Sequence, residues 1–430
     1  MTSTNAKGVR LLIAALLIVA VLERVAWAAK RGWITSAGEA TNVALALASG
    51  RGFADPYSYT SGATAHLMPT TPALAGAIYW LISPNTVAAE MVLQAIACAE
   101  MIAGYLLLFA LFGRLGAPIG ARLAGLGVLC GLPVFMGQES LDFRYWEGGL
   151  AVVLATGSLI VLIDLDAQAA PPSWLQRVAV AALFAATFFT SPPLGLAVAA
   201  CSLILLLRKP AWPGRWQMSI VAAFALVLVL TPWTIRNYQV MGKPILLRSN
   251  MGLELALANN PLQANEANKA AFDRSMVRLH PSVAGPGRVR MQQVGEVAYM
   301  AELSRATTDW ISANPETFVR LCLRHFRQMF FPDAFQFEIG SGSFSHARAI
   351  WYAVVSAIGL LALGLCVRRG EIGYIYVSLS IAIVTATYVP FQPMARYLYL
   401  NYGLLVFAAA ALMHQTATVS WARRRPIKPL

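Results

Sequence analysis

The sequence predicts an all-α, polytopic membrane protein with about ten transmembrane helices and a small, mostly helical outer domain. Of its 430 residues, 58% are hydrophobic and only 12% are charged, whereas an ordinary globular chain is about 25% charged. Apolar runs of helical length recur along the chain and are separated by short basic loops. In such a chain, the net charge of +13 indicates basic loops that orient helices in a bilayer. Nucleic-acid binding is disfavoured.

Ten apolar runs are the candidate transmembrane helices. The first follows Lys7 and Arg10 and is too long for the apolar part of a cleaved signal peptide, so we expect a retained anchor. Whether the fifth and sixth runs cross is left open, because each is shorter than the roughly 20 residues that a perpendicular helix needs. The runs are 9–29, 86–112, 118–136, 148–163, 178–190, 194–207, 218–235, 349–367, 372–389 and 397–413.

Basic residues assign a side of the membrane to each loop. Clusters near residues 114–122, 177, 208–215, 368–369 and 423–428 all fall on the side of Lys7, as the positive-inside rule requires. Both termini are thus expected in the cytoplasm. The division that follows is a transmembrane module at 1–235 with a first outer loop at 30–71, an outer domain at 236–346, and C-terminal transmembrane helices with a basic cytoplasmic tail at 347–430.

The outer domain is expected to be loop-rich in its first half and helical in its second. Four prolines interrupt the first half. In the second half, Asn314 can cap a helix that starts at Pro315, and Glu316 suits the positive end of the helix dipole. This helix should run to about Phe331.

Cysteine and histidine patterns give little support for metal or redox chemistry. Four of the five cysteines sit in apolar runs, and no CxxC spacing occurs. No second histidine stands at ligand spacing from His66. A divalent metal is therefore possible but not supported, and no cofactor is predicted with certainty.

Glu39 is the leading candidate for a catalytic group. It precedes an apolar stretch, residues 43–48, that ends at Ser49 and Gly50 and is typical of a short interfacial helix stopped by glycine. A carboxylate held there can take a proton from an acceptor hydroxyl. The alternative is an acid that only stabilises the helix N-terminus.

Other polar residues near the outer boundary are weaker candidates. His66 can polarise a substrate, although a lone loop histidine is more often a structural hydrogen-bonding group. Tyr145 can hold a substrate or simply belong to the interfacial aromatic belt. The secondary acidic candidates are Asp55, Glu139, Asp142 and Glu147.

Two arginines are predicted on the outer side, where short loops usually carry few basic residues. Arg236 ends the seventh apolar run and Arg396 begins the tenth. Each can grip a phosphate with its planar fork of N–H donors. The alternative for each is snorkelling to lipid head groups.

The order of several motifs resembles that of bacterial membrane glycosyltransferases of the GT-C superfamily. These relatives include the protein mannosyltransferases (glycosyltransferase family 39) and the lipid A aminoarabinose transferases. The resemblance covers nearly the whole chain. The motifs are Gly38-Glu39-Ala40, 50–53, 232–238, 252–255, 295–300, Asn314-Pro315 and Arg396-Tyr397.

The resemblance implies an inverting glycosyltransferase of the bacterial inner membrane with a periplasmic active site. Its donor would be a polyprenyl-phosphate-linked sugar, and its acceptor a hydroxyl of a lipid, glycan or protein. Glu39 occupies the place of the general base. Arg236 or Arg396 would stabilise the leaving phosphate, and Tyr145 and His66 would hold the sugar or phosphate.

The chain departs from the family pattern immediately before Glu39. Many relatives carry an Asp-Glu pair there, whereas this chain has Gly38. The missing Asp weakens the case for a metal site. It also leaves a catalytically inactive scaffold subunit as one alternative function. A transporter or flippase of a lipid-linked sugar is the other, although the internal repeat that many transporters carry is not evident.

Overall fold

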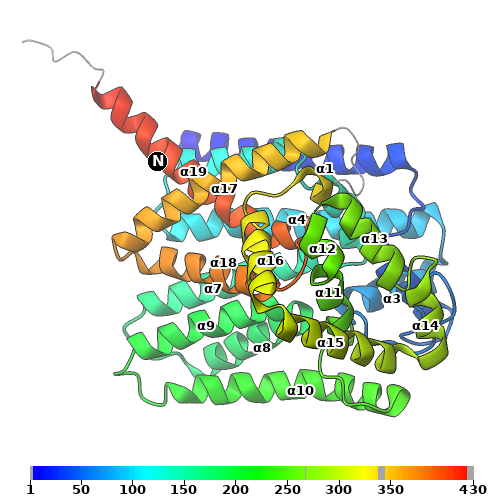
Figure 1. Ribbon diagram of the computed structural model, residues 1–430. Coiled ribbons are helices and arrows are strands. Elements are labelled where there is room, and N and C mark those ends of the chain that lie inside the picture. The colour runs from blue at the N-terminus through cyan, green and yellow to red at the C-terminus, as the bar shows by residue number, and fades with distance from the viewer. Residues whose placement is uncertain (1–2, 267, 338–343, 424–430) are drawn as a thin grey trace, which may run out of the picture.

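The computed structural model describes residues 3–266, 268–337 and 344–423, and this part of the chain is helical, without strands. The longest helices lie side by side in one bundle, and the first residues of α1 and the last of α19 lie at the same end of it (Figure 1). Residues 424–430, which hold most of the predicted basic tail, lie outside the described residues.

Nine of the ten predicted apolar runs each coincide with one helix and the third is broken. The described helices that are long and apolar enough to cross a membrane number six, or seven if one bent pair is counted. α8, α9 and α18 have 17 residues each, fewer than the roughly 20 of a perpendicular span. The all-helical class is therefore confirmed, whereas the predicted count of ten spans is not. The six are α1 (Ser3–Arg31), α4 (Val87–Arg114), α7 (Gly148–Ala167), α10 (Trp216–Met241), α17 (Ser345–Arg368) and α19 (Ala395–Arg423); the shorter helices are α8 (Trp174–Thr190), α9 (Pro192–Arg208) and α18 (Ile372–Tyr388).

The third run is broken. α5 (Ile119–Gly131) and α6 (Met136–Ser140) are followed by the 3₁₀ turn η1 (Asp142–Arg144), and the two parts are bent by 70°. Pro133 lies in the break; it has no N–H for a continuous helix, and its ring disfavours the helical conformation of Leu132.

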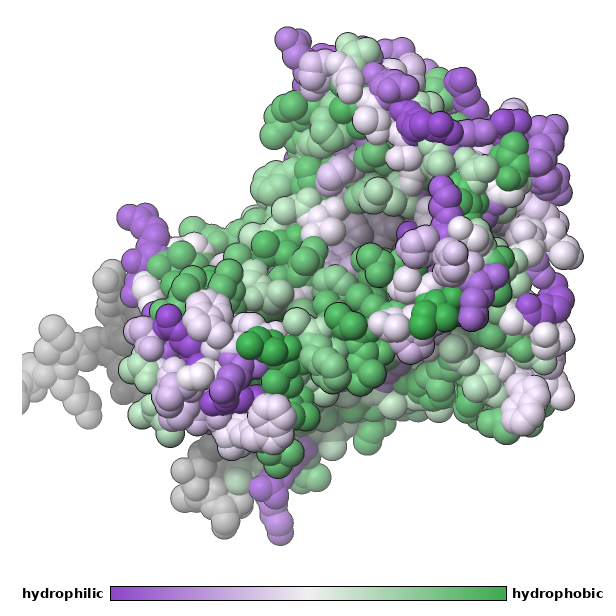
Figure 2. Space-filling view, turned by 90° about the horizontal axis from the view of Figure 1, so that it is seen from below, coloured by the Kyte–Doolittle hydropathy of each residue, from purple (hydrophilic) through white to green (hydrophobic). Residues whose placement is uncertain are grey.

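Lipid-facing and enclosed spans differ in burial. The apolar window of α19 is 72% buried, whereas that of α10 is only 11% buried. On α10 the exposed residues Ile220, Phe224 and Leu228 recur every four positions and so share one helix face. Figure 2 shows broad hydrophobic surface between more hydrophilic ends, as expected for a belt in contact with lipid.

Two helices that pack on each other follow α1, and the second starts at the end of the predicted first outer loop. α2 (Glu39–Ala48) confirms the predicted short helix, whereas α3 (Thr70–Ile82) was not predicted. A side chain at Gly76 would meet the Cβ of Leu47 at 2.8 Å and the carbonyl of Ala44 at 3.2 Å. The close approach of α2 and α3 therefore depends on this glycine.

The segment after α10 is helical in both halves, which corrects the expectation of a loop-rich first half. The predicted boundary at Arg236 also falls inside α10, which continues to Met241. A small core of Leu253, Met291 and Met300 includes Tyr57 from the first outer loop. The helices are α11 (Met251–Ala258), α12 (Pro261–Glu266), α13 (Lys269–Leu279), α14 (Pro286–Val294), α15 (Glu296–Ala313) and α16 (Pro315–Gln328), followed by the turn η2 (Ala334–Phe337).

α16 begins at Pro315, as predicted, and ends three residues before the expected Phe331. Asn314 makes no side-chain cap; its amide donates instead to the carbonyl of Trp310, 2.9 Å away.

Candidate functional site

Glu39 is the first residue of α2 and lies against the turn that follows α13. Its Oε1 accepts a hydrogen bond from Ser282 Oγ at 2.8 Å and lies 3.6 Å from His280 Nε2. The preceding Gly38 has φ 71° and ψ −133°, a conformation that is essentially restricted to glycine. The backbone at Gly38 thus sets the position of Glu39 at the start of the helix.

The surroundings of Glu39 favour its ionised form. Burial is the largest single influence and raises the pKa of Glu39, but His280, His66 and the hydrogen bonds together hold that pKa below its ordinary value. Its side chain is 17% exposed. The group is therefore a carboxylate at neutral pH and can accept a hydrogen bond or a proton from a hydroxyl.

His66 lies in the same cluster. Its Nδ1 is 3.2 Å from the hydroxyl of Tyr57, and its ring contacts that of His280 edge-on. Burial lowers the pKa of His66 to about 3, and the positive charges of Arg248 and Arg396 act in the same direction. His66 is therefore neutral at physiological pH and can orient a substrate but does not supply a permanent charge.

Two arginines belong to the electrostatic surroundings of this cluster. Arg396 is the second residue of α19, and its guanidinium carbon lies 4.1 Å from the centre of the Trp146 ring. Arg248, in the loop before α11, forms an ion pair with Glu147, and its Nε has no hydrogen-bond partner among the described residues. Beside Arg396 lies a cavity of about 20 Å³ lined also by Trp146 and Glu147.

Arg236 is not part of this arrangement. Its two terminal nitrogens donate to the carbonyls of Thr64 at 2.6 Å and Phe53 at 2.5 Å, and its guanidinium lies over the rings of Phe53 and Trp233. Glu296 holds the same stretch of loop through the Thr64 hydroxyl at 2.6 Å. Arg236 therefore fastens the first outer loop to α10.

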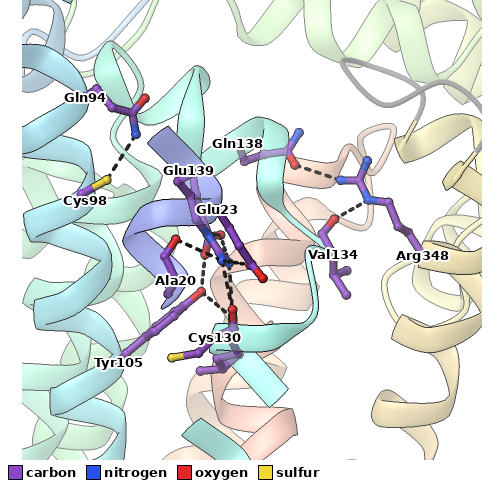
Figure 3. Close-up of polar contacts among 12 residues, drawn as sticks. Ala20, Glu23, Gln94, Cys98, Tyr105, Cys130, Val134, Gln138, Glu139 and Arg348 are labelled. Carbon is purple, nitrogen blue, oxygen red and sulfur yellow. Dashed lines mark hydrogen bonds and ion pairs between the residues drawn. The ribbon is translucent and has the colours of Figure 1, made fainter. Parts of the chain in front are cut away.

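Glu139 and Tyr145 lie inside the bundle instead of beside Glu39. Glu139 accepts hydrogen bonds from Tyr105 at 2.5 Å and Arg24 at 2.8 Å, so α6 is tied to α4 and α1 (Figure 3). The hydroxyl of Tyr145 is 2.8 Å from both oxygens of Glu90, and the side chain is fully buried. Both residues hold helices together in this structure.

The remaining acidic candidates also have local partners. Asp55 accepts hydrogen bonds at 2.8 Å from the backbone N–H groups of Ser61 and Gly62 and closes a turn of the first outer loop. Asp142 is hydrogen-bonded to Gln138 and lies in the field of Arg396. Of the secondary candidates, Glu147 pairs with Arg248 and Asp142 is under the electrostatic influence of Arg396.

Sequence reasoning missed Arg248, His280 and Ser282. Ser282 lies 243 positions from Glu39 in the chain, and no local motif marks it. The only local signal is the turn residue Pro281 between His280 and Ser282. Within the described residues, no group of three His, Cys, Asp or Glu side chains is arranged to hold a metal ion.

Comparison by sequence finds no matching family model and no matching curated protein. Comparison by structure matches AglB, an archaeal oligosaccharyltransferase from Archaeoglobus fulgidus in complex with an inhibitory peptide and a dolichol-phosphate, with a TM-score of 0.53 at 13% identity over 97% of this chain. The apo form of the enzyme from the same organism gives 0.52 at 11% identity over 96%. This chain spans about half of those proteins, namely 52% and 51% of their lengths.

ArnT from Cupriavidus metallidurans, bound to undecaprenyl phosphate, aligns over 99% of this chain and 82% of its own length, with 13% identity and a TM-score of 0.38. AglB and ArnT are both membrane glycosyltransferases of the GT-C superfamily. At these identities the likeness to AglB concerns the fold.

Proposed function

We propose that this chain, which shares the fold of GT-C membrane glycosyltransferases, transfers a sugar from a polyprenyl-phosphate donor to a hydroxyl acceptor on the outer face of the membrane. The observation that carries the proposal is Glu39, an ionised carboxylate held by Ser282 and His280. Glu39 follows the end of α1 that lies away from the first residues of α1 and the last residues of α19 (Figure 1). A base in this position suits an acceptor that approaches from the outer aqueous side.

The donor phosphate is assigned to Arg396 and Arg248. The positive charges of both arginines contribute to lowering the pKa of His66, which neighbours Glu39, and we assign the cations and the base to one reaction centre. Guanidinium groups bind phosphate oxygens through paired N–H donors. The AglB structure that contains a dolichol-phosphate supports a lipid phosphate as the carrier.

Transfer then proceeds as a single displacement with inversion. The acceptor oxygen forms a bond to the anomeric carbon while its proton passes to Glu39. The bond from that carbon to the phosphate oxygen breaks, and the polyprenyl phosphate leaves with the electron pair. Arg396 and Arg248 stabilise the negative charge that grows on the leaving phosphate.

Donor binding also requires the Arg248–Glu147 ion pair to separate. The cavity of about 20 Å³ beside Arg396 has room for about one water molecule and none for a sugar phosphate. The donor phosphate replaces Glu147 as the partner of Arg248, so one charge-assisted contact is exchanged for another.

The test is transfer of labelled sugar by purified protein supplied with polyprenyl-phosphate sugars and hydroxyl acceptors in micelles. Glu39→Gln should lower turnover by about 10²–10⁴-fold, the usual contribution of a general base. Glu316→Gln, which changes an exposed carboxylate on α16, is the matched control and should retain activity. Unchanged turnover in Glu39→Gln would remove the proposed base. Movement of lipid-linked sugar across liposomes without new glycosidic bonds would favour transport.

A further inference from the structure

The connection between α18 and α19, residues 389–393, is held by side chains of the segment that follows α10. Three of its carbonyls lie at hydrogen-bond distance from side chains at the end of α11, on α16 and on η2. The contacts are Asn259 Nδ2 to the carbonyl of Pro390 at 2.7 Å, His325 Nδ1 to that of Val389 at 3.0 Å, and Gln336 Nε2 to that of Pro393 at 2.7 Å. In Figure 1, α16 correspondingly crosses the bundle beside the end of α18.

These contacts are buried, so their loss is costly. Asn259 is 1% exposed, and His325 and Gln336 are fully buried. Burial lowers the pKa of His325 to about 4, so its ring is neutral and its Nδ1 carries the proton that the carbonyl accepts. Removal of one donor leaves a carbonyl without its partner where water has little access. The connection therefore has one preferred position relative to the segment after α10.

The connection leads directly to Arg396, the second residue of α19. Tyr388 precedes the connection and Tyr397 follows it, and their rings stack with centroids 4.1 Å apart. This stack closes the chain between them into a loop. The guanidinium of Arg396 then lies over the ring of Trp146. A shift of the connection therefore moves the backbone of Arg396 and changes where its N–H donors point.

α11 links this connection to the second cation of the proposed phosphate site. Arg248 lies three residues before α11, and Asn259 is the residue immediately after it. α11 is seated so closely on α15 that a Cβ at Gly252 would lie 2.2 Å from the carbonyl oxygen of Met300, so the helix has little freedom to shift. One short helix therefore fixes the distance between Arg248 and the residue that holds the connection to Arg396.

We propose that Asn259 is a positioning residue for the donor phosphate. Its amide, through the carbonyl of Pro390, holds Arg396 at the separation from Arg248 that lets both guanidinium groups bind one phosphate. His325 supports the same connection, and neither side chain needs to touch the donor. This role presupposes the proposed function, which assigns the phosphate to the two arginines. Donors that are already in place bind an anion more tightly than donors that binding must first order.

The test compares the affinities of tritium-labelled undecaprenyl phosphate and undecaprenol for the purified full chain in detergent micelles. The two lipids share the prenyl chain and differ in the phosphate. The ratio of their dissociation constants, here called the phosphate preference, therefore reports on the phosphate site. A general loss of stability affects both lipids alike and leaves this ratio unchanged. Wild-type protein should bind undecaprenyl phosphate more tightly than undecaprenol.

Asn259→Ala should lower the phosphate preference about fivefold, which corresponds to the net contribution of one hydrogen bond. Asn260→Ala is the matched control. Asn260 is the next residue in the chain, but its amide donates to the carbonyls of Ala256 and Leu257 within the same segment. Its replacement should leave the phosphate preference unchanged.

Further variants separate the positioning of Arg396 from a local structural effect. In an Arg396→Ala background, Asn259→Ala should leave the phosphate preference unchanged, because the group that Asn259 positions is absent. His325→Leu should lower the preference in the wild-type background, whereas His325→Asn, whose amide takes the place of the Nδ1–H group, should retain most of it. The His325 variants give the same information if Asn259→Ala does not fold.

An unchanged phosphate preference in Asn259→Ala, or an equal reduction in Asn260→Ala, would overturn the positioning role. The same reduction from Asn259→Ala with and without Arg396 would overturn it too. Equal affinities of the two lipids for wild-type protein would instead overturn the assignment of the phosphate to the arginines, and the positioning role with it. Loss of the positioning role alone and loss of the proposed phosphate site thus give different results.

Discussion

Replacement of His66 by asparagine should make the protein less sensitive to mild acid. His66 is 3% exposed and lies beside the hydroxyl of Tyr57. Its pKa is lowered from 6.5 to about 3, chiefly by burial. The unfolded chain therefore takes up a proton as the pH falls below about 6.5, whereas the folded chain does not, and stability is lost over that range. Asparagine keeps a hydrogen-bonding group near Tyr57 and has no proton to gain.

The expected magnitude follows from the size of this shift. At pH 5 the unfolded-state pKa is 1.5 units above the pH, so His66 costs about 2 kcal/mol relative to pH 7, at 1.36 kcal/mol per unit. Glu39 affects stability at lower pH. Its pKa is lowered in the folded protein, so the stability that it contributes is lost only as the pH falls below the ordinary pKa range of a glutamate. The difference in stability between wild type and His66→Asn over pH 7 to 5 isolates His66, because other groups that titrate in this range, such as the buried His325, contribute to both proteins.

The assay is urea-induced unfolding in mild detergent micelles at several pH values, with the free energy of unfolding extrapolated at each. The wild-type protein should lose about 2 kcal/mol more than His66→Asn between pH 7 and 5. His346→Asn serves as the control for replacing an exposed histidine. Parallel pH dependences for wild type and His66→Asn would refute the buried, neutral state of His66.

Two further predictions concern stability. Arg24→Met should lower the free energy of unfolding by about 3–5 kcal/mol, because it leaves the carboxylate of Glu139, only 2% exposed, without its partner. Arg24→Met/Glu139→Leu should recover most of that loss in urea titrations, and equal losses in the two variants would contradict the pairing. Gly38→Asp and Gly38→Ala should each cost about 1–3 kcal/mol, because φ at this position is positive; thermal unfolding checks this, and a stable aspartate variant would show that glycine is not required.

Local patterns were sufficient for most of the long apolar helices. Nine of the ten apolar runs became single helices, and the short helix after Gly38 begins at Glu39 and ends where Ser49 and Gly50 predicted. These signals are local because apolar runs and capping residues act within a few turns. The resemblance to GT-C enzymes was likewise confirmed at the level of the fold. The length of each span was less predictable, since packing decides how far α8, α9 and α18 extend.

The sequence by itself determined that this chain is a helical membrane protein and that Glu39 starts a helix after the first span. Only the tertiary structure decided which polar residues meet. Ser282 and His280 lie beside Glu39 although more than 240 positions separate them in the chain. Arg236 donates to a loop carbonyl, and Tyr145 is buried beside Glu90. The physical reason is that buried polar groups must find partners wherever the packed chain supplies them, and residue order along the chain does not encode those encounters.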